Sequence, residues 1–428
     1  MKITNVYQVA ARRLCIGCGA CFYICPNEKV ELVDIEDDGI RPIMLGSPEA
    51  GKLESCEDCR RCLEVCPGVK TALPAVNSSG AIEQLKKRWG QIIGLWEGYA
   101  ADPEIRFKGS SGGLCTALSL FCIEKGTAGG VLHIGSDPQK PLKNKTFRST
   151  SREDLVGRTG SRYSPASACD GLKLIEEAEY PSVFVGKPCD VAGLRMAQAI
   201  HPELDHKTSL AIGFFCAGTP STRGTLDLLQ KYNIKLDEIS ELRYRGWGWP
   251  GMAAVWHKNE KEPFVRVSYK DSWGFVQKYR PFRCYLCPDL TAEFADISVG
   301  DPWYREVGGN EPGQSLILIR TEKGRKIFKE AIESGYVKAV RAEPDILYKS
   351  QKNLLEKRQA IWGRILAMKL LGIPYPRLKG FHLFENWLDL PAKEKVKSVL
   401  GTARRIIQRN YFKPLDYSRY HGINGASS

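Results

Sequence analysis

The chain has 428 residues, 15 cysteines and a formal net charge of +13, with a sequence pI near 9.0. A chain of this length can bury a large core, so the cysteines are not needed to staple a small scaffold. The 6 histidines are scattered and form no HExxH pair, which argues against a zinc enzyme built on histidines.

The sequence predicts a cytoplasmic protein. No charged and apolar leader follows Met1, and no apolar run approaches the roughly 18 residues of a membrane span. Cytoplasmic thiols stay reduced, so closely spaced cysteines indicate metal or redox chemistry rather than disulfides. The positive charge favours an acidic partner, such as an anionic cofactor, an acidic protein or a membrane surface. Basic residues are dispersed and no recognition motif is present, so we expect no nucleic acid.

Two cysteine ladders open the chain, "LCIGCGACFYICPN" and "SCEDCRRCLEVCPG". Both read C-x2-C-x2-C-x3-C-P, the run of two-cluster ferredoxins, in which the fourth cysteine of each run ligates the other cluster. We therefore predict two 4Fe-4S clusters with crossed ligands. The first is assigned to Cys15, Cys18, Cys21 and Cys66, and the second to Cys56, Cys59, Cys62 and Cys25. A pair of zinc knots or a disulfide framework is the alternative.

Between the ladders, "KVELVDIEDDGIRPIML" alternates apolar and polar residues and turns at Asp38-Gly39, which predicts a β-hairpin. We expect a ferredoxin module over residues 1–75. The stretch "PAVNSSG" opens a linker, placed at residues 76–95.

A glycine-rich segment, Gly109 to Gly113, precedes an amphipathic helix that starts in "SSGGLCTALSLFC". Free backbone N-H groups and the positive end of the helix dipole make this start suitable for a phosphate-bearing cofactor. The alternative is an ordinary serine-capped helix. Cys122 falls on the apolar stripe of this helix and is predicted to be a core thiol, as are Cys115 and Cys169.

A third cysteine group follows in "GKPCD", "FFCAGTP" and "CYLCPD". Cys189 and Cys216 each follow a strand-like apolar run, while Cys284 and Cys287 form a C-x2-C pair. The spacing is compatible with a third 4Fe-4S cluster, with a zinc site, or with unrelated core thiols. The stretch "RGWGWPGM" satisfies G-x-G-x-x-G, but we interpret it as an aromatic turn because a strand rather than a helix follows it.

Over residues 96–345 the chain resembles the family of beta subunits of coenzyme F420-reducing hydrogenases and dehydrogenases. The matching pieces are "SSGG", "GSRYSPAS", "VFVGKPCDVAGL", "GFFCAGTPS", "LRYRGWGWPG", "CYLCPD" and "EFADISVGDPW". With the leading ferredoxin module, the resemblance covers about four fifths of the chain.

The resemblance implies an FAD at the glycine-rich helix start and a third 4Fe-4S cluster. Its cysteine ligands would be Cys189, Cys216, Cys284 and Cys287, and the flavin contacts would be Ser111, Gly112, Gly113, Ser161, Tyr163 and Lys187. Arg162 stands where many relatives have lysine, and the two cations differ in hydrogen-bonding geometry. Asp296 and Asp301 are expected near the third cluster. No catalytic residue is assigned.

The function implied is an iron-sulfur flavoprotein oxidoreductase that passes electrons between 4Fe-4S clusters, FAD and a hydride-carrying partner such as reduced coenzyme F420. One alternative is a reductase of another substrate, in surface-polysaccharide or tetrapyrrole biosynthesis. Another is an electron-transfer subunit that has no substrate of its own and serves a redox partner, either a ferredoxin or a component of a larger complex.

The expected fold is α+β: a ferredoxin module, a mixed α/β flavin and iron-sulfur core at residues 96–345, and a helical, basic C-terminal region at residues 346–428. In "KEKVKSVLGTARRIIQRN" an apolar stripe of Val396, Val399, Leu400, Ala403, Ile406 and Ile407 predicts a basic amphipathic helix. This helix packs on its own domain or docks to a membrane surface or partner subunit.

Overall fold

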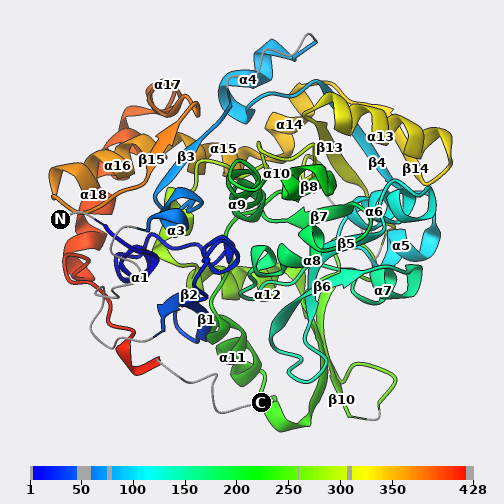
Figure 1. The fold of residues 1–428 in the computed structure, drawn as a ribbon, viewed down its shortest axis with the longest axis horizontal. Helices are drawn as coiled ribbons and strands as arrows, with labels where there is room; N and C mark the ends of the chain where they lie inside the picture. Colours follow the sequence, from blue (N-terminus) through cyan, green and yellow to red (C-terminus); the bar gives the residue numbers. More distant parts are fainter. Residues whose placement is uncertain (1–2, 46–58, 75–79, 259, 306–310, 421–428) are drawn as a thin grey trace.

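The computed structural model describes residues 3–45, 59–74, 80–258, 260–305 and 311–420, and within these residues it contains one eight-stranded mixed sheet (Figure 1). The strand order is β14-β4-β13-β12-β8-β7-β5-β6. The strands are β4 (Gly94–Ala100), β5 (Gly130–Ser136), β6 (Asn144–Ser149), β7 (Ser182–Gly186), β8 (Thr208–Phe214), β12 (Ile297–Gly300), β13 (Ser315–Ile319) and β14 (Val337–Arg341). The chain is therefore a mixed α/β structure.

The four central strands, β5, β7, β8 and β12, run parallel, and the outer strands are antiparallel to their neighbours. Parallel neighbours end at the same edge of a sheet. The segments that follow β7, β8 and β12 carry Cys189, Cys216 and Asp301, so all three lie at this edge. The strand-like runs before Cys189 and Cys216 are confirmed as β7 and β8.

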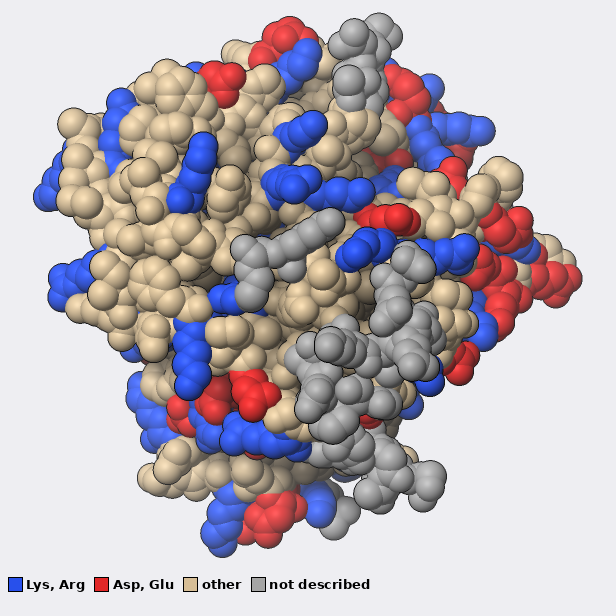
Figure 2. All heavy atoms as spheres, turned by 60° about the vertical axis from the view of Figure 1, so that its left-hand side comes forward, with Lys and Arg blue, Asp and Glu red and all other residues tan. Residues whose placement is uncertain are grey.

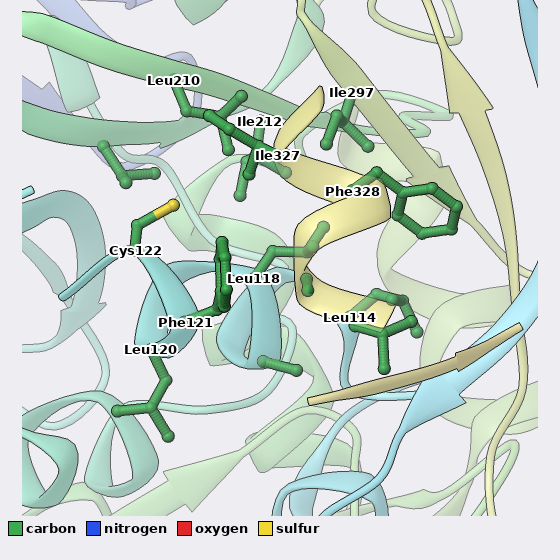
Figure 3. Close-up of a cluster of buried hydrophobic side chains, with 14 of the residues drawn as sticks. Leu114, Leu118, Leu120, Phe121, Cys122, Leu210, Ile212, Ile297, Ile327 and Phe328 are labelled. Carbon is green, nitrogen blue, oxygen red and sulfur yellow. The ribbon is translucent and has the colours of Figure 1, made fainter. Parts of the chain in front are cut away.

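Side chains alternate between the two faces of the sheet, which places two hydrophobic cores on opposite sides. Leu210 and Ile212 of β8 pack with α6 (Leu114–Glu124) and α13 (Glu322–Glu333), as Figure 3 shows. Ala211, between them, packs in the opposite core. Cys122 is fully buried in the first core, which confirms its predicted packing role.

The N-terminal module packs on that opposite core. Its predicted hairpin is confirmed as β1 (Val30–Ile35) and β2 (Gly39–Met44). Its helices are α1 (Val6–Ala11), α2 (Ala20–Tyr23) and α3 (Arg61–Glu64), followed by β3 (Lys70–Ala72). Part of the segment expected as a linker forms α4 (Glu83–Trp89), whose Leu85 and Trp89 are buried.

Shorter elements surround the sheet. The helices are α5 (Pro103–Lys108), α7 (Arg152–Gly157), α8 (Lys173–Glu176), α9 (Pro188–Gln198), α10 (Pro202–His206), α11 (Thr222–Lys231) and α12 (Tyr269–Val276). A separate sheet contains β9 (Ile239–Arg243), β10 (Met252–His257) and β11 (Val265–Ser268). The strand β10 begins directly after "RGWGWPG", which confirms a turn and not a dinucleotide-binding helix start.

The C-terminal region is helical and lies beside the N-terminal module (Figure 1). Its elements are α14 (Asp345–Ser350), α15 (Lys352–Gln359), α16 (Ile361–Leu370), β15 (Arg377–Lys379), α17 (Leu383–Leu388) and α18 (Ala392–Gln408). The strand β15 pairs in parallel with β3, and Tyr417 N donates to Tyr7 Oη at 3.1 Å. None of the described helices combines the length and apolar character needed to cross a bilayer.

The amphipathic helix α18 packs on the chain through its polar face and one residue of its apolar stripe. Its buried residues are Ser398, Thr402 and Ile406, and a Cβ at Gly363 of α16 would come within 2.0 Å of Ser398 Oγ. Half of the stripe is exposed: Val396 is 56% exposed, Leu400 63% and Ile407 60%. Because Gly363 and Ser398 are small, the backbones of α16 and α18 can approach closely at this point, which explains why the polar face of α18 packs against α16.

Candidate functional site

The first predicted ligand set is brought together. Cys15, Cys18, Cys21 and Cys66 line one small pocket in the N-terminal module. Three of them come from the loop and helix around α2, and Cys66 comes from the second ladder, after α3. A Cβ at Gly68 would lie 2.5 Å from Leu14 O and 3.3 Å from Cys66 Sγ, so only glycine fits there. The arrangement matches the crossed assignment.

These thiols are buried, and burial raises the pKa of Cys15, Cys21 and Cys66, with the neighbouring sulfurs raising that of Cys21 and Cys66 further. Gly17 N donates to Cys15 Sγ at 3.3 Å. Buried thiols without a cation stay protonated, and a metal centre is what would deprotonate them. The residues present therefore fit a ferredoxin-type cluster with backbone N-H groups directed at sulfur.

The second ligand set is described in part, because Cys56 lies outside the described residues. Cys62 is close enough to Cys21 to raise its pKa. Lys29 N donates to Cys25 Sγ at 3.3 Å. Cys59 lies at the start of the described segment before α3.

The third group also converges. Burial raises the pKa of Cys189, Cys216 and Cys287, and the charges of these sulfurs and Cys284 act on one another. For Cys216 the raised pKa is about 11. Cys189 lies in the first turn of α9, and Cys216 lies after β8. Cys284 lies in a 3-10 turn at Phe282–Leu286, and Cys287 directly follows that turn.

Within the described parts of the chain, no three His, Cys, Asp or Glu side chains are arranged as ligands of a single metal ion. A zinc ion bound at about 2.3 Å needs its sulfurs closer together than a four-iron cage does.

A cavity of about 1160 Å3 opens at the carboxyl edge of the parallel strands. Ligand cavities are usually about 300–1,000 Å3, so this one can hold a large cofactor. Five of the six flavin contacts expected from the resemblance are on its wall: Ser111, Gly113, Ser161, Tyr163 and Lys187. Cys216 of the third cysteine group is on the same wall.

Gly112 is the exception. Its N-H donates to Ser315 Oγ at 2.8 Å, at the start of β13, and the residue is buried away from the cavity wall. The hydroxyl of Ser111 is also engaged, because it donates to Gln314 O at 2.6 Å. The glycine-rich start of α6 is thus tied to β13, while Gly109, Ser110 and Gly113 face the cavity.

Lys187 precedes α9 and forms a buried ion pair with Asp190, with Nζ to Oδ2 at 2.7 Å. Its ammonium also donates to Ala166 O at 3.0 Å. Burial alone would lower the pKa of Lys187, but the Asp190 carboxylate and neighbouring sulfurs outweigh burial and raise it. Lys187 therefore presents a fixed positive charge beside the cavity and the third cysteine group.

Arg162 and the two expected acids have structural partners. Arg162 donates to Leu242 O at 2.6 Å and to Pro141 O at 2.8 Å, so its guanidinium joins loops. Asp296 accepts from Ala211 N at 2.8 Å in the core of the sheet. Asp301 lies on the cavity wall and pairs with the buried Arg245, with Oδ2 to Nη1 at 2.9 Å.

An aromatic wall was not predicted from the sequence. Tyr269 stacks on Trp303 with ring centres 5.4 Å apart and an interplanar angle of 9°. The Arg245 guanidinium lies 4.6 Å from the Tyr269 ring centre, and Trp273 packs 4.7 Å from Tyr163. Flat aromatic surfaces of this kind suit a planar ring system. The cluster of aromatic residues in "YKDSW" was the available signal.

Comparisons with known proteins agree with this geometry. Residues 95–173 match the family model of the coenzyme F420 hydrogenase/dehydrogenase beta subunit N-terminal domain, and residues 182–345 match the model of its C-terminal domain. The chain belongs to the family of coenzyme F420 hydrogenase/dehydrogenase beta subunits. Residues 8–67 match a 4Fe-4S dicluster domain, which accounts for both ladders.

Relatives in this family include the coenzyme F420 hydrogenase subunit beta of Methanococcus voltae, 27% identical over 65% of this chain and 95% of the relative. A subunit of the F(420)H(2) dehydrogenase of Methanosarcina mazei is 25% identical over 86% of this chain and 92% of the relative. The coenzyme F420-dependent sulfite reductase of Methanocaldococcus jannaschii is 28% identical, and the match spans 47% of that protein.

A chain of the F420-reducing NiFe hydrogenase complex of Methanosarcina barkeri has a similar fold, with a TM-score of 0.53 and 24% identity. The similarity covers 68% of this chain and 97% of that chain.

Proposed function

We propose that the protein is an iron-sulfur flavoprotein oxidoreductase that exchanges electrons between 4Fe-4S clusters and a hydride-carrying partner such as reduced coenzyme F420. The observation that carries this proposal is one cavity whose wall holds both Cys216 and five of the expected flavin contacts. When bound, a flavin couples two-electron hydride chemistry to single-electron clusters. The names of the relatives, which include a hydrogenase, a dehydrogenase and a sulfite reductase, support an oxidoreductase.

The chain's own residues have distinct tasks in this proposal. The converging cysteines hold three clusters, and the Tyr269–Trp303 stack offers a flat surface for a ring system. Lys187 is held rigidly by Asp190, so its positive charge requires no rearrangement to stabilise an anionic neighbour.

Anaerobic purification followed by cofactor analysis tests the proposal. Three clusters and one flavin predict about twelve irons and one FAD per chain. Replacing Cys216 by Ala is expected to remove about four of these irons, while Cys122→Ala, a buried thiol in the core, keeps them all. Eight irons and no flavin in the wild-type protein would contradict the proposal.

Mixing the oxidised protein with reduced coenzyme F420, NADH or reduced ferredoxin in a stopped-flow instrument then ranks the partners. Cluster bleaching by reduced coenzyme F420 that requires bound flavin supports an enzyme. Bleaching by ferredoxin alone, independent of flavin, supports the second candidate, an electron-transfer subunit.

The exposed stripe of α18 favours contact with another subunit. Val396, Leu400 and Ile407 are all more than half exposed on one face, and the relatives are named as subunits of hydrogenases and dehydrogenases. Apolar surface of this kind usually marks an interface. Sedimentation with anionic phospholipid vesicles separates the two kinds of docking: pelleting that Leu400→Asp abolishes would assign the stripe to a membrane instead of a subunit.

A further inference from the structure

The polar face of α18 forms part of the cavity wall. Lys397, Ser398, Gly401, Thr402 and Arg405 line the cavity from this helix, which the family models do not cover. A Cβ at Gly401 would meet nothing closer than 4.0 Å, which is consistent with open space in front of the helix. The helix therefore directs its polar face toward the cavity and its apolar face outward.

Three cations from three helices meet at this end of the cavity: Lys357 of α15, Arg364 of α16 and Arg405 of α18. Arg364 Nη1 donates to Tyr285 O, and the Arg405 guanidinium lies 4.6 Å from the Tyr285 ring centre. The same tyrosine lies between the two cysteines of the C-x2-C pair.

No carboxylate of the described residues forms an ion pair with Lys357, Arg364 or Arg405. Most of the other cations on the cavity wall differ in this respect, whereas Arg162 also pairs with no carboxylate of the described residues and donates to backbone oxygens instead. Lys187 pairs with Asp190, Arg245 with Asp301, and Lys397 with Glu394. Glu356 is also on the wall, but it is exposed and forms no pair with the three cations.

These cations also lie close to other charged groups. Burial and then the nearby Arg280 lower the pKa of Lys357 to about 8, while the sulfurs of Cys216 and Cys284 act in the opposite direction. Burial and then Arg405 lower the pKa of Arg364 to about 10. Like charges collected in a partly buried place destabilise one another unless an anion is bound there.

We propose that Lys357, Arg364 and Arg405 form a binding site for the oxyanion group, phosphate or carboxylate, of a small molecule that enters the cavity. Arginine forks match the geometry of such groups, and the cavity walls exclude part of the water that would screen them. Figure 2 shows Lys and Arg spread over this side of the molecule, with Asp and Glu gathered mainly at the right edge and in smaller groups at the top, lower left and bottom. The net charge of +13 favours approach of an anion.

The identification of this molecule as the protein's redox substrate rests on the proposed function. Binding of the anion at these three cations does not depend on it. A flavin-free protein would contradict the proposed function and leave this anion site testable. The test therefore measures binding of inorganic phosphate, and of succinate as a carboxylate probe, by titration calorimetry on the anaerobically purified full-length protein.

The informative variant is Arg364→Gln/Arg405→Gln. The matched control is Arg404→Gln/Arg409→Gln, which removes the same charge from exposed positions of α18 and the residue after it that do not line the cavity. We expect the first variant to bind at least one of the probes more than about 10-fold more weakly than wild type does, and the control to bind like wild type. Iron and flavin contents should equal those of wild type in both variants.

Three results would overturn the site. Absence of binding of both probes to the wild-type protein is one. Equal weakening of probe binding in the informative variant and the control is the second, because it would show that binding depends on the net charge of the protein and not on these positions. Loss of flavin in Arg364→Gln/Arg405→Gln is the third, because the cations would then hold the flavin's own phosphates. If that variant fails to fold, Lys357→Gln and Arg405→Lys provide the same comparison, with binding weakened by the first and largely kept by the second.

Discussion

Cys169 donates a hydrogen bond from its thiol to the backbone oxygen of Asp190, at 3.2 Å. Its sulfur also lies beside that of Cys18 and lowers the pKa of Cys18. The single thiol proton is donated either to Asp190 O or, once a cluster makes Cys18 a thiolate, to Cys18 Sγ. Asp190 directly follows Cys189 of the third group. Cys169, expected to be a simple core thiol, thus bridges a predicted ligand of the first cluster and the backbone that holds the third.

Replacing Cys169 by Ala should lower the reduction potential of one N-terminal cluster. Hydrogen bonds to cluster sulfurs raise the potential, and one bond worth about 1 kcal/mol corresponds to roughly 40 mV for one electron. Redox titration followed by EPR measures this shift. Cys122→Ala, equally buried but remote from the ladders, should leave the potentials unchanged, and an equal shift in that control would refute the assigned contact.

Crossed ligation is testable with pairs of substitutions. Cys15→Ala/Cys66→Ala removes two ligands of one cluster, so about eight of about twelve irons should remain. Cys15→Ala/Cys25→Ala removes one ligand from each of two clusters, so about four should remain. Iron analysis of the anaerobically purified variants that gave the reverse order would show that each ladder holds its own cluster.

The orientation of α18 predicts a large loss of stability at one residue and almost none at its neighbour. Ile406 is 0% exposed, so Ile406→Ala should lower the free energy of unfolding by about 2–4 kcal/mol. Ile407 is 60% exposed, so Ile407→Ala should change it by less than about 0.5 kcal/mol. Thermal unfolding of the two variants side by side provides the measurement, and a larger loss at Ile407 would show that the exposed part of the stripe is the packed face.

His133 should make the protein sensitive to acid. Burial lowers the pKa of His133 to about 4, and Nε2 lies 2.8 Å from Ser149 Oγ. The unfolded chain binds the proton near pH 6.5, so between pH 6.5 and about 4 stability falls with falling pH, by at most about 1.4 kcal/mol per unit.

Thermal midpoints measured from pH 7 to 5 for the wild type, His133→Gln and the exposed control His206→Gln test this dependence. The difference between the wild type and His133→Gln should shrink as the pH falls, because the histidine's advantage disappears on protonation. His206→Gln should parallel the wild type. Parallel curves for all three proteins would exclude a role for His133 in the pH dependence.

The elements that carry local signals could be predicted from the sequence. The hairpin at Asp38-Gly39, the helix that buries Cys122 and the strands before Cys189 and Cys216 all follow from turn chemistry and periodicity. The convergence of the third cysteine group could be expected only in part. Cys189 and Cys216 follow parallel strands, whose ends lie at one edge of the sheet, but the position of the C-x2-C pair depends on long-range packing.

The remainder depends on long-range contacts that leave no local pattern. The three cations of the cavity come from helices far along the chain, and the spacing of Lys357, Arg364 and Arg405 gives no sign that they meet. Periodicity revealed an apolar stripe on α18 but not which face packs, since Ser398 and Gly363 decide that by close approach. The backbone N-H of Gly112 donates to Ser315 Oγ and is therefore not directed at the cavity, and the sequence gives no sign of this bond.

The chain's last described segment packs against the ferredoxin module. Arg12 Nη1 donates to Phe412 O at 2.9 Å, Leu415 N donates to Ala11 O at 2.9 Å, and Tyr417 meets Tyr7. Carrier modules on free tethers deliver charge by swinging between docking positions. Here this segment holds the module on one side and the sheet core holds it on the other, where Ser167 Oγ donates to Gly17 O at 2.7 Å. The ladders therefore keep a constant separation from the sheet edge, and the rate of electron transfer should be insensitive to solvent viscosity.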